Sequence, residues 1–305
     1  MPQPLAYFQG RFQPAVAVGL ALHDAGFVMG ATVTDLCRTV RHRLYRWDDH
    51  LARFHRSCEL THITPPIADE EITRLAQELV AHNAALVRPT DDLALVLFAT
   101  PGPIGFYAGL EGGVGDAPPT LGMHTFPLPF ARYRRLFSEG AHLAVPHIKQ
   151  IPANCVDPRI KQRSRLHWWH ADREIHAAFP GAAAVLLNEH NHLTETASAN
   201  LLIVKNGVVQ SPPREMILGG ISLLTVEELC RELGVAFVER PLMMEDAQEA
   251  DEMMLSCTSY CLCGVSKFNG ATVPWPGAVF QRLLSAWGER IGLDIRAQVE
   301  SCDSS

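Results

Sequence analysis

The sequence predicts an α/β protein of two domains. Its 305 residues are 47% hydrophobic and 19% charged, which provides enough apolar material for the cores of two globular domains. Short extended runs alternate along the chain with segments whose apolar residues recur at helical spacing. A stretch rich in glycine and proline at 111–119 separates the two halves. This composition excludes collagen-like, coiled-coil and disordered chains.

The first half predicts strands that precede a pair of helices. Extended runs are expected at 15–22, 32–40 and 43–47. Helices are expected at 48–63 and 69–86, because their apolar side chains repeat every three or four residues and acidic side chains occupy their first turns.

Two more strands, at 92–100 and 120–126, complete this half. The sequence PLPF at 127–130 is typical of a connector, because its prolines interrupt regular structure. We therefore expect a small N-terminal α/β domain at 1–126, a connector at 127–130 and a larger C-terminal domain at 131–305.

The second half predicts a helix followed by hairpins. The helix should begin after Ser164, whose hydroxyl can cap it. Hairpins are expected between 182 and 211, with Asn206-Gly207 as one of the turns. Further strands are expected at 142–145, 235–242 and 252–259, and further helices at 223–234, 245–249 and 278–291.

Charge and hydropathy argue against nucleic-acid and membrane partners. The net charge is −7, so no overall positive field attracts a polyanion. The N-terminal sequence lacks the layout of a signal peptide, and no run of eighteen apolar residues occurs. We expect a cytoplasmic protein.

The cysteines and histidines do not predict a metal site. The eight cysteines are expected to be buried thiols, and the cluster Cys257, Cys261 and Cys263 does not match the spacing of zinc ligands. His167 and His170 stand three residues apart on a predicted helix, but the sequence offers no obvious third ligand.

Lysine is scarce, which narrows any amine chemistry to four side chains. Lys161 lies where a predicted strand meets a helix, whereas Lys205 and Lys267 lie beside turns and should be exposed. Lys161 is therefore the best candidate for a Schiff base, with Lys149 as its competitor. The alternative is that Lys161 is a surface cation in a basic run.

Two polar segments could bind an anion. Gly219-Gly220-Ile221-Ser222 precedes a predicted helix, where free N–H groups and the helix dipole favour a phosphate. In the simpler reading, Ser222 only caps the helix. Ser256-Cys257-Thr258-Ser259 follows a predicted strand and could add donors to the same anion, or be an ordinary loop.

Glu195 is a single acid among small residues in a predicted hairpin. A carboxylate that is partly buried there needs a cationic or hydrogen-bonding partner. Either a nearby arginine or a bound group could supply it.

Taken in order, these segments resemble the class IV aminotransferases. That family comprises the pyridoxal-phosphate enzymes of fold type IV, among them branched-chain and D-amino-acid aminotransferases and aminodeoxychorismate lyase. The resemblance spans nearly the whole chain and is carried by Asp24-Ala25-Gly26-Phe27, Gly30, HLARFHRS at 50–57, Lys161, TETASAN at 194–200, ILGGIS at 217–222 and SCTS at 256–259.

The resemblance implies a two-domain fold whose larger C-terminal domain is a pseudo-barrel, with pyridoxal 5′-phosphate as cofactor. It makes Lys161 the lysine that bonds the cofactor and Glu195 the partner of the pyridine nitrogen. Arg53 would bind the cofactor phosphate. The remaining cofactor-binding residues implied are Asn200, Gly220, Ile221, Ser222, Cys257 and Thr258.

Several positions depart from the family pattern and concern the substrate. Pro101 stands where D-amino-acid members carry an arginine, which weakens that specificity. Other departures are Thr34-Asp35 in place of an aromatic–acidic pair, Leu202 in place of an aromatic residue and Leu223 in place of a basic one. Thr34 and Asp35 are candidates for substrate binding, and the substrate carboxylate could be bound by Arg38, Tyr107, Arg163 or Arg165.

We therefore expect an aminotransferase that acts on an amino acid and a 2-oxo acid, with branched-chain or other apolar L-amino acids favoured. The alternatives are aminodeoxychorismate lyase, a D-amino-acid aminotransferase and a non-catalytic member that binds the cofactor or a metabolite. A homodimer is expected from the resemblance, and no bound metal, nucleic acid or membrane partner.

Overall fold

The structure is a computed structural model that describes residues 3–300. The chain divides into two compact units. The first unit comprises the residues up to Leu128 together with Ile160–Ser164, and the second unit comprises Pro129–Arg159 and the chain from Arg165 onward. The predicted domain limits at 127–130 stay a proposal, and they do not anticipate that 160–164 packs with the first unit.

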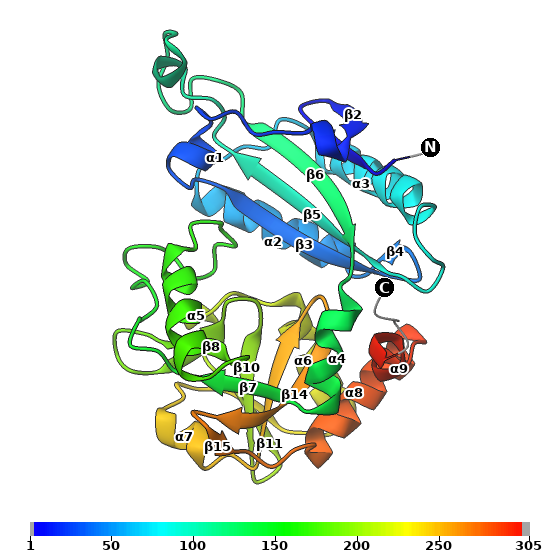
Figure 1. Cartoon of the computed structure of the whole chain (residues 1–305), viewed down its shortest axis with the longest axis vertical. Coiled ribbons are helices and arrows are strands. Elements are labelled where there is room, and N and C mark those ends of the chain that lie inside the picture. Colours follow the sequence, from blue (N-terminus) through cyan, green and yellow to red (C-terminus); the bar gives the residue numbers. More distant parts are fainter. Residues whose placement is uncertain (1–2, 301–305) are drawn as a thin grey trace. The chain divides into compact units, whose positions relative to one another are not determined.

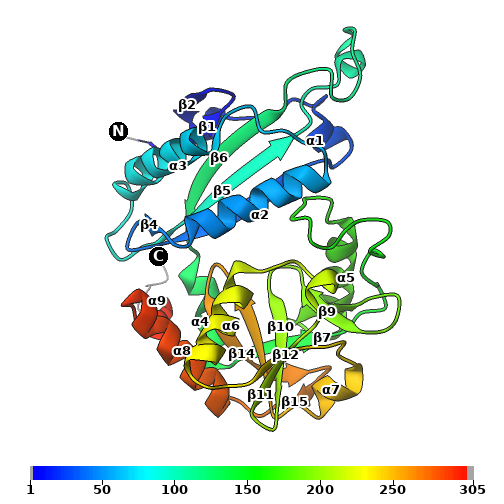
Figure 2. The same cartoon turned by 180° about the vertical axis from the view of Figure 1, so that it is seen from behind.

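The first unit is an antiparallel sheet with two helices on one face, as Figures 1 and 2 show from opposite sides. The strand order is β2-β1-β6-β5-β3-β4. The strands are β1 (Leu5–Phe8), β2 (Arg11–Pro14), β3 (Val33–Val40), β4 (Arg43–Leu44), β5 (Leu93–Thr100) and β6 (Thr120–Pro127), and the helices are α1 (Ala25–Val28), α2 (Trp47–Leu60) and α3 (Asp69–Ala84).

Amphipathic patterns place α2 and α3 on the sheet. The buried side chains Leu51, Phe54 and Cys58 form one stripe of α2, and they pack in a common core with Leu79 of α3 and Leu97 of β5. Acidic side chains occupy the first turn of both helices, where the helix dipole favours them.

The second unit contains a nine-stranded sheet that closes on itself. The additional pairing of β10 with β9 completes a ring of strands in the order β10-β13-β14-β7-β8-β9, and this ring is the predicted pseudo-barrel. The strands are β7 (Ala141–Ala144), β8 (Ala183–Leu187), β9 (Leu193–Thr196), β10 (Asn200–Lys205), β11 (Val208–Ser211), β12 (Phe237–Glu239), β13 (Glu252–Cys257), β14 (Cys261–Phe268) and β15 (Ala271–Thr272).

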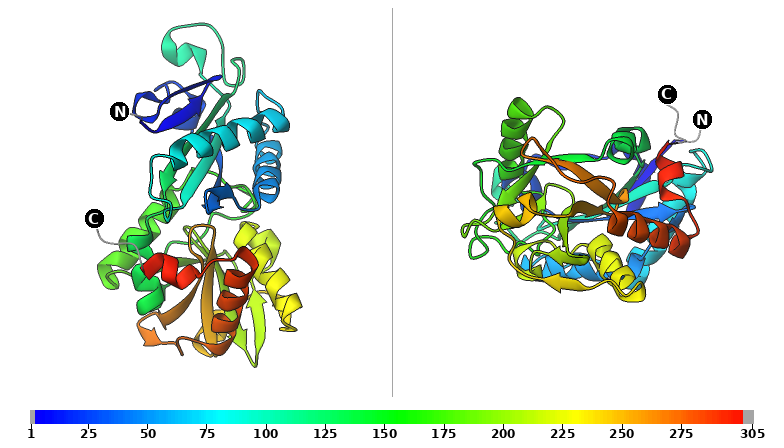
Figure 3. Two further views of the ribbon diagram at one scale, coloured as in Figure 1. Left: turned by 90° about the vertical axis from the view of Figure 1, so that its right-hand side faces the viewer. Right: turned by 90° about the horizontal axis from the view of Figure 1, so that it is seen from below.

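Helices cover the outside of these strands. In the right-hand view of Figure 3, α6 in yellow and α8 in orange-red lie beside them. The helices are α4 (Phe130–Ser138), α5 (Leu166–Ala178), α6 (Ile221–Glu232), α7 (Met244–Gln248), α8 (Ala278–Ile291) and α9 (Ile295–Glu300). Within residues 3–300, no helix combines the length and the apolar character needed to cross a bilayer.

The predicted strand at 15–22 is wrong. The segment starts with a short 3-10 helix at Ala15–Ala17, and Val16 and Leu22 are largely exposed. The strand that pairs with β1 is instead β2, which lies just before this segment in the chain. The run at 43–47 is likewise a strand only at Arg43–Leu44.

Helix α4 was not predicted, and its first residue, Phe130, was assigned to the connector. Phe130 and Phe137 are both buried and lie seven residues apart, which is two helical turns. The predicted cap of α5 is also wrong. Its N-cap is Arg165, and the Ser164 hydroxyl donates to the carbonyl of Gly30 instead.

Cys155 contradicts the expectation that all cysteines are buried. Its side chain is exposed, whereas the other cysteines of the described residues are buried and free of disulfides. Cys302 lies outside the described residues.

Candidate active site

In the second unit, Glu195 is held by two hydrogen bonds. The backbone N–H of Leu218 donates to Oε1 at 3.1 Å, and the Asn200 side-chain amide donates to Oε2 at 3.0 Å. Asn200 also donates to the carbonyl of Leu218 at 2.9 Å, so one amide joins the hairpin to the segment before α6. Together the two hydrogen bonds fix the direction in which the carboxylate points.

Arg165 is an arginine whose charge acts on Glu195, but its hydrogen bond and its ring contact are made with other residues. Its guanidinium donates to the carbonyl of Ala197 and lies over the ring of Trp168. Burial lowers the pKa of Arg165, while the negative charge of Glu195 acts in the opposite direction. The two side chains therefore interact through space, and Asn200 and Leu218 supply the hydrogen bonds described above.

The N-terminus of α6 lies directly beside this carboxylate network. Gly220 is its N-cap residue and makes no side-chain cap hydrogen bond, and Ile221 and Ser222 are the first helical residues. A Cβ at Gly220 would overlap Oδ1 of Asn200, whereas a Cβ at Gly219 would meet no atom within 4 Å. The first N–H groups of a helix lack intrahelical acceptors, which makes this end suited to an anion.

Strand register brings the segment 256–259 to the same place. Asn200 pairs with Glu195 on one side and with Ser256 on the other. The Ser256 hydroxyl is buried, and within the described residues no hydrogen-bond partner is found for it. Cys257 ends β13, and Thr258 begins the turn that follows. The site residues predicted in the second unit thus gather around one end of three adjacent strands.

Gly220→Ala is expected to lower the free energy of unfolding by about 1–3 kcal/mol, because the new methyl group displaces the amide that holds Glu195. Denaturant unfolding of the variant measures this loss. Gly219→Ala is the matched control and should unfold like the parent protein, because the position is open. Equal effects of the two substitutions would contradict the role given to Asn200.

In the first unit, Lys161 lies on a short extended segment beside β3. The N–H of Thr34 donates to the carbonyl of Lys161 at 2.8 Å, and the N–H of Arg163 donates to the carbonyl of Thr32 at 2.9 Å. The N–H of Lys161 donates to the hydroxyl of Ser57 on α2 at 3.1 Å. The lysine backbone is therefore fixed to both the sheet and the helix.

Asp35, His50 and Arg53 form a buried cluster in the same unit. Nε and one terminal nitrogen of Arg53 each donate to a different oxygen of Asp35 at 2.8 Å, and Nδ1 of His50 lies 2.7 Å from the same carboxylate. Burial alone would raise the pKa of Asp35, but the charges and hydrogen bonds of Arg53 and His50 hold it well below its usual range. Burial also lowers the pKa of His50, so its imidazole is neutral near pH 7 and donates from Nδ1.

The four candidates for substrate binding lie in different surroundings. Asp35 is 2% exposed and binds Arg53, and Thr34 is equally buried, with its hydroxyl donating to the carbonyl of Leu97. Arg38 is buried in an ion pair with Asp92. Tyr107 lies in a short 3-10 helix at Gly105–Ala108, is exposed, and its ring is tilted against that of Phe106 with 4.5 Å between the ring centroids. Their roles toward a substrate stay predictions.

Sequence reasoning missed three contributors to the site. His50 precedes Arg53 by three residues and so shares its helix face, which is a signal the sequence does contain. Ser57 and the N–H of Leu218 act through contacts between segments far apart in the chain, and no local pattern reveals them.

Within residues 3–300, no group of three His, Cys, Asp or Glu side chains is arranged to hold a metal ion.

Comparisons with known proteins identify the family. The profile of the class IV aminotransferases matches residues 32–268. The chain is 26% identical over 274 residues, 88% of either chain, to a protein of Methanocaldococcus jannaschii provisionally named a branched-chain-amino-acid aminotransferase. It is 23% identical over 271 residues, 87% of this chain and 89% of the other, to the D-alanine aminotransferase of Bacillus licheniformis.

The fold is shared with solved structures of branched-chain amino acid aminotransferases. That of Escherichia coli superposes with a TM-score of 0.85 at 19% identity, over 94% of either chain. One from T.th., solved with pyridoxamine 5′-phosphate, superposes with a TM-score of 0.83 at 22% identity, over 98% of this chain and 97% of the other. The family profile covers well over half of the sequence and includes both units. The chain therefore belongs to the class IV aminotransferase family and is a pyridoxal 5′-phosphate-dependent transaminase.

Proposed function

We propose that this protein transfers the amino group between a branched-chain or other apolar L-amino acid and a 2-oxo acid. The observation that carries the amino-transfer part of the proposal is the fixed carboxylate of Glu195, which lies beside a helix end suited to an anion within one unit. A carboxylate for the ring nitrogen and a helix end for the phosphate are the two features that pyridoxal 5′-phosphate requires.

The donor set of the second unit fits the cofactor phosphate. The N–H groups of Ile221 and Ser222, at the positive end of a twelve-residue helix, favour a dianion, and the Ser222 hydroxyl adds a donor. The buried Ser256 hydroxyl, without a partner in the described residues, offers a further polar atom nearby. We assign Gly220, Ile221, Ser222, Cys257 and Thr258 to the phosphate side and Asn200 with Glu195 to the ring side.

We assign Arg53 and Lys161 in the first unit to the same cofactor. The guanidinium of Arg53 is paired with Asp35, which already neutralises part of its charge. Its contribution to phosphate binding should therefore be that of an oriented donor as well as a charge. Lys161, with its backbone fixed by Thr34 and Ser57, is the amine that would bond the cofactor.

When bound, pyridoxal 5′-phosphate supplies an electron sink for the bonds at the substrate Cα. Glu195 would keep a proton on the ring nitrogen, because a nearby carboxylate stabilises the cationic ring. Nζ of Lys161 would move the proton between the substrate Cα and the cofactor carbon on the other side of the amino nitrogen, which is general acid–base catalysis by one group. The hydrogen bonds of Asn200 and Leu218 hold Glu195 in place throughout.

The substrate class rests on sequence departures and on the named relatives. Pro101 lacks the cationic side chain that D-amino-acid members carry at this position. The branched-chain names of the archaeal relative and of the solved structures support apolar L-amino acids. A homodimer and a cytoplasmic location complete the proposal as expectations from the resemblance.

A half-reaction titration tests this substrate class. Addition of L-leucine or L-valine to the holoenzyme should convert its visible absorption band within the dead time of manual mixing, whereas D-alanine should act much more slowly. A faster response to D-alanine or D-glutamate would overturn the stereochemical assignment. Release of a 2-oxo acid without an amino acceptor would favour the lyase, and no response to any amino acid would favour a non-catalytic member.

A further inference from the structure

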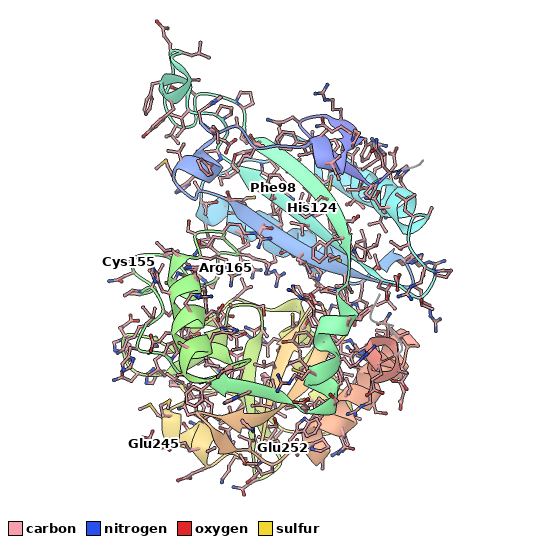
Figure 4. All side chains as sticks on the ribbon, in the orientation of Figure 1. Phe98, His124, Cys155, Arg165, Glu245 and Glu252 are labelled. Carbon is pink, nitrogen blue, oxygen red and sulfur yellow. The ribbon has the colours of Figure 1, made fainter. Side chains whose placement is uncertain are left out.

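The sheet of the first unit has one face that α2 and α3 do not cover. Val33, Leu97 and Met123 point into the core beneath these helices. Because side chains alternate along a strand, Thr34, Phe98 and His124 project from the opposite face. Phe98 and His124 lie side by side on β5 and β6 in Figure 4, and both are half-buried.

The segment that carries Lys161 extends this face at the edge of β3. Gln162 pairs with Val33 in an antiparallel bridge, so these two residues share the core side. Ile160 packs against the core cluster, which agrees with that assignment. Lys161 and Arg163 alternate with Gln162 and therefore lie on the uncovered face.

Arg163 is positioned there by two contacts. Its N–H donates to the carbonyl of Thr32, and one terminal guanidinium nitrogen lies 3.4 Å from the hydroxyl of Thr34. The residue is nevertheless exposed. Burial, together with the positive charge of Arg163, lowers the pKa of His124, so the field of the guanidinium extends over this face.

The other arginines considered for the carboxylate lie in settings that suit the role less well. Arg38 is buried against Asp92, and Arg165 belongs to the second unit, where it binds the carbonyl of Ala197. Arg163 shares both the unit and the sheet face of Lys161, and it is exposed. Its guanidinium can therefore be approached by a carboxylate that lies on this face.

An aromatic surface continues from Arg163 across the sheet. Phe8, Gly122, Phe98 and Thr34 are in register on four adjacent strands. A Cβ at Gly122 would lie 2.5 Å from the ring of Phe98, so the glycine lets this ring lie flat on β6. The rings of Phe8 and Phe98 are 6.4 Å apart. The face thus places the positive charge of Arg163 beside an apolar aromatic surface.

We propose that Arg163 binds the carboxylate shared by the amino-acid and 2-oxo-acid substrates, and that Phe98 contacts their apolar side chain. This inference rests on the proposed function, in which Lys161 is the reactive amine. Lys161 and Arg163 are two positions apart in extended chain, with Gln162 between them, which is a span of about 7 Å. With that spacing, the amine of Lys161 can reach the substrate Cα while the planar guanidinium of Arg163 forms a bidentate contact with the substrate carboxylate.

Calorimetry with an unreactive pair of probes tests the role of Arg163. The holoenzyme should bind 4-methylvalerate at least about tenfold more tightly than its uncharged amide, as a charge-assisted contact requires. Arg163→Gln should abolish this preference and raise KM for the 2-oxo acid about tenfold or more, with little change in kcat. Arg163→Lys should retain part of the preference, because it keeps the charge but not the planar fork.

Arg74→Gln is the matched control, because Arg74 is an exposed arginine of the same unit that pairs with Glu71 and Glu78 on α3. It should bind both probes like the parent protein. Phe98→Ala should weaken both probes by the same factor, which separates side-chain contact from carboxylate contact. Thermal unfolding of each variant checks that the fold is kept.

An unchanged preference for the carboxylate in Arg163→Gln would overturn the inference. A parent protein that selects the carboxylate through Arg163 yet transaminates no apolar amino acid would instead contradict the proposed function alone. The two failures are therefore distinguishable.

Discussion

Lys161→Ala is expected to abolish the visible absorption of the cofactor bond and to reduce transamination by about four orders of magnitude or more, since we propose that this one residue supplies both the bond and the proton transfer. The reactive amine cannot be replaced by another lysine of the first unit, because the remaining lysines, Lys149, Lys205 and Lys267, belong to the second unit. Spectroscopy of the purified variant and single-turnover kinetics measure the two losses separately.

Lys149→Ala is the matched control for this experiment. Lys149 is exposed and donates to the side chain of Asn191, so its removal should leave both the spectrum and the rate intact. Reduction of the parent protein with borohydride, followed by peptide mass spectrometry, should recover the cofactor on the peptide that contains Lys161. Recovery on Lys149 would show that the assignment is wrong.

Glu195→Gln is expected to leave the cofactor bound while slowing the proton transfer by about a thousandfold. A carboxylate and a cation 4 Å apart interact by about 4 kcal/mol at an effective dielectric constant of about 20. That energy corresponds to about three pKa units on the ring nitrogen. The amide oxygen can still accept the N–H of Leu218, whereas the amide nitrogen cannot accept from Asn200, so the negative charge and one hydrogen bond are lost together.

Single-turnover rates, measured at saturating cofactor and as a function of pH, test this expectation. Glu189→Gln is the control, because Glu189 is an exposed glutamate of the same hairpin. A normal rate with full cofactor occupancy would reduce Glu195 to a structural residue. A loss of cofactor without a change in the rate of the occupied fraction would point to the same conclusion.

The periodicity of apolar residues predicted the elements that carry a complete apolar pattern. The helix at 278–291 and the strand at 92–100 agree with α8 and β5 nearly to the residue, because each carries a complete apolar pattern and clear ends. The segment 15–22 failed for the opposite reason. Its apolar residues suit a strand, but a strand exists only where a partner lies beside it, and pairing depends on residues distant in the chain.

In the candidate site too, local sequence revealed some residues, whereas others became apparent only from contacts between distant segments. Glu195 and the GGIS segment stood out because their residue types are unusual in their local setting. The partners that orient them were not predictable, because the N–H of Leu218 is a backbone group that any residue could supply. Asp35 illustrates the reverse case. A candidate for the substrate proved to be the buried counter-ion of Arg53, and only the packing of α2 on β3 reveals that pairing.

The membership of Ile160–Ser164 in the first unit has a consequence for how the chain acquires its structure. A fragment that ends at Leu128 would lack the edge segment that pairs with Val33, and with it Lys161, the lysine that we propose bonds the cofactor. The contact between Val33 and Gln162 joins residues that are far apart in the sequence. During synthesis, it can form only after more than a hundred residues beyond β3 have been added. Because Lys161 enters the first unit only after the chain has begun the second, catalytic competence should be among the last properties to arise in folding.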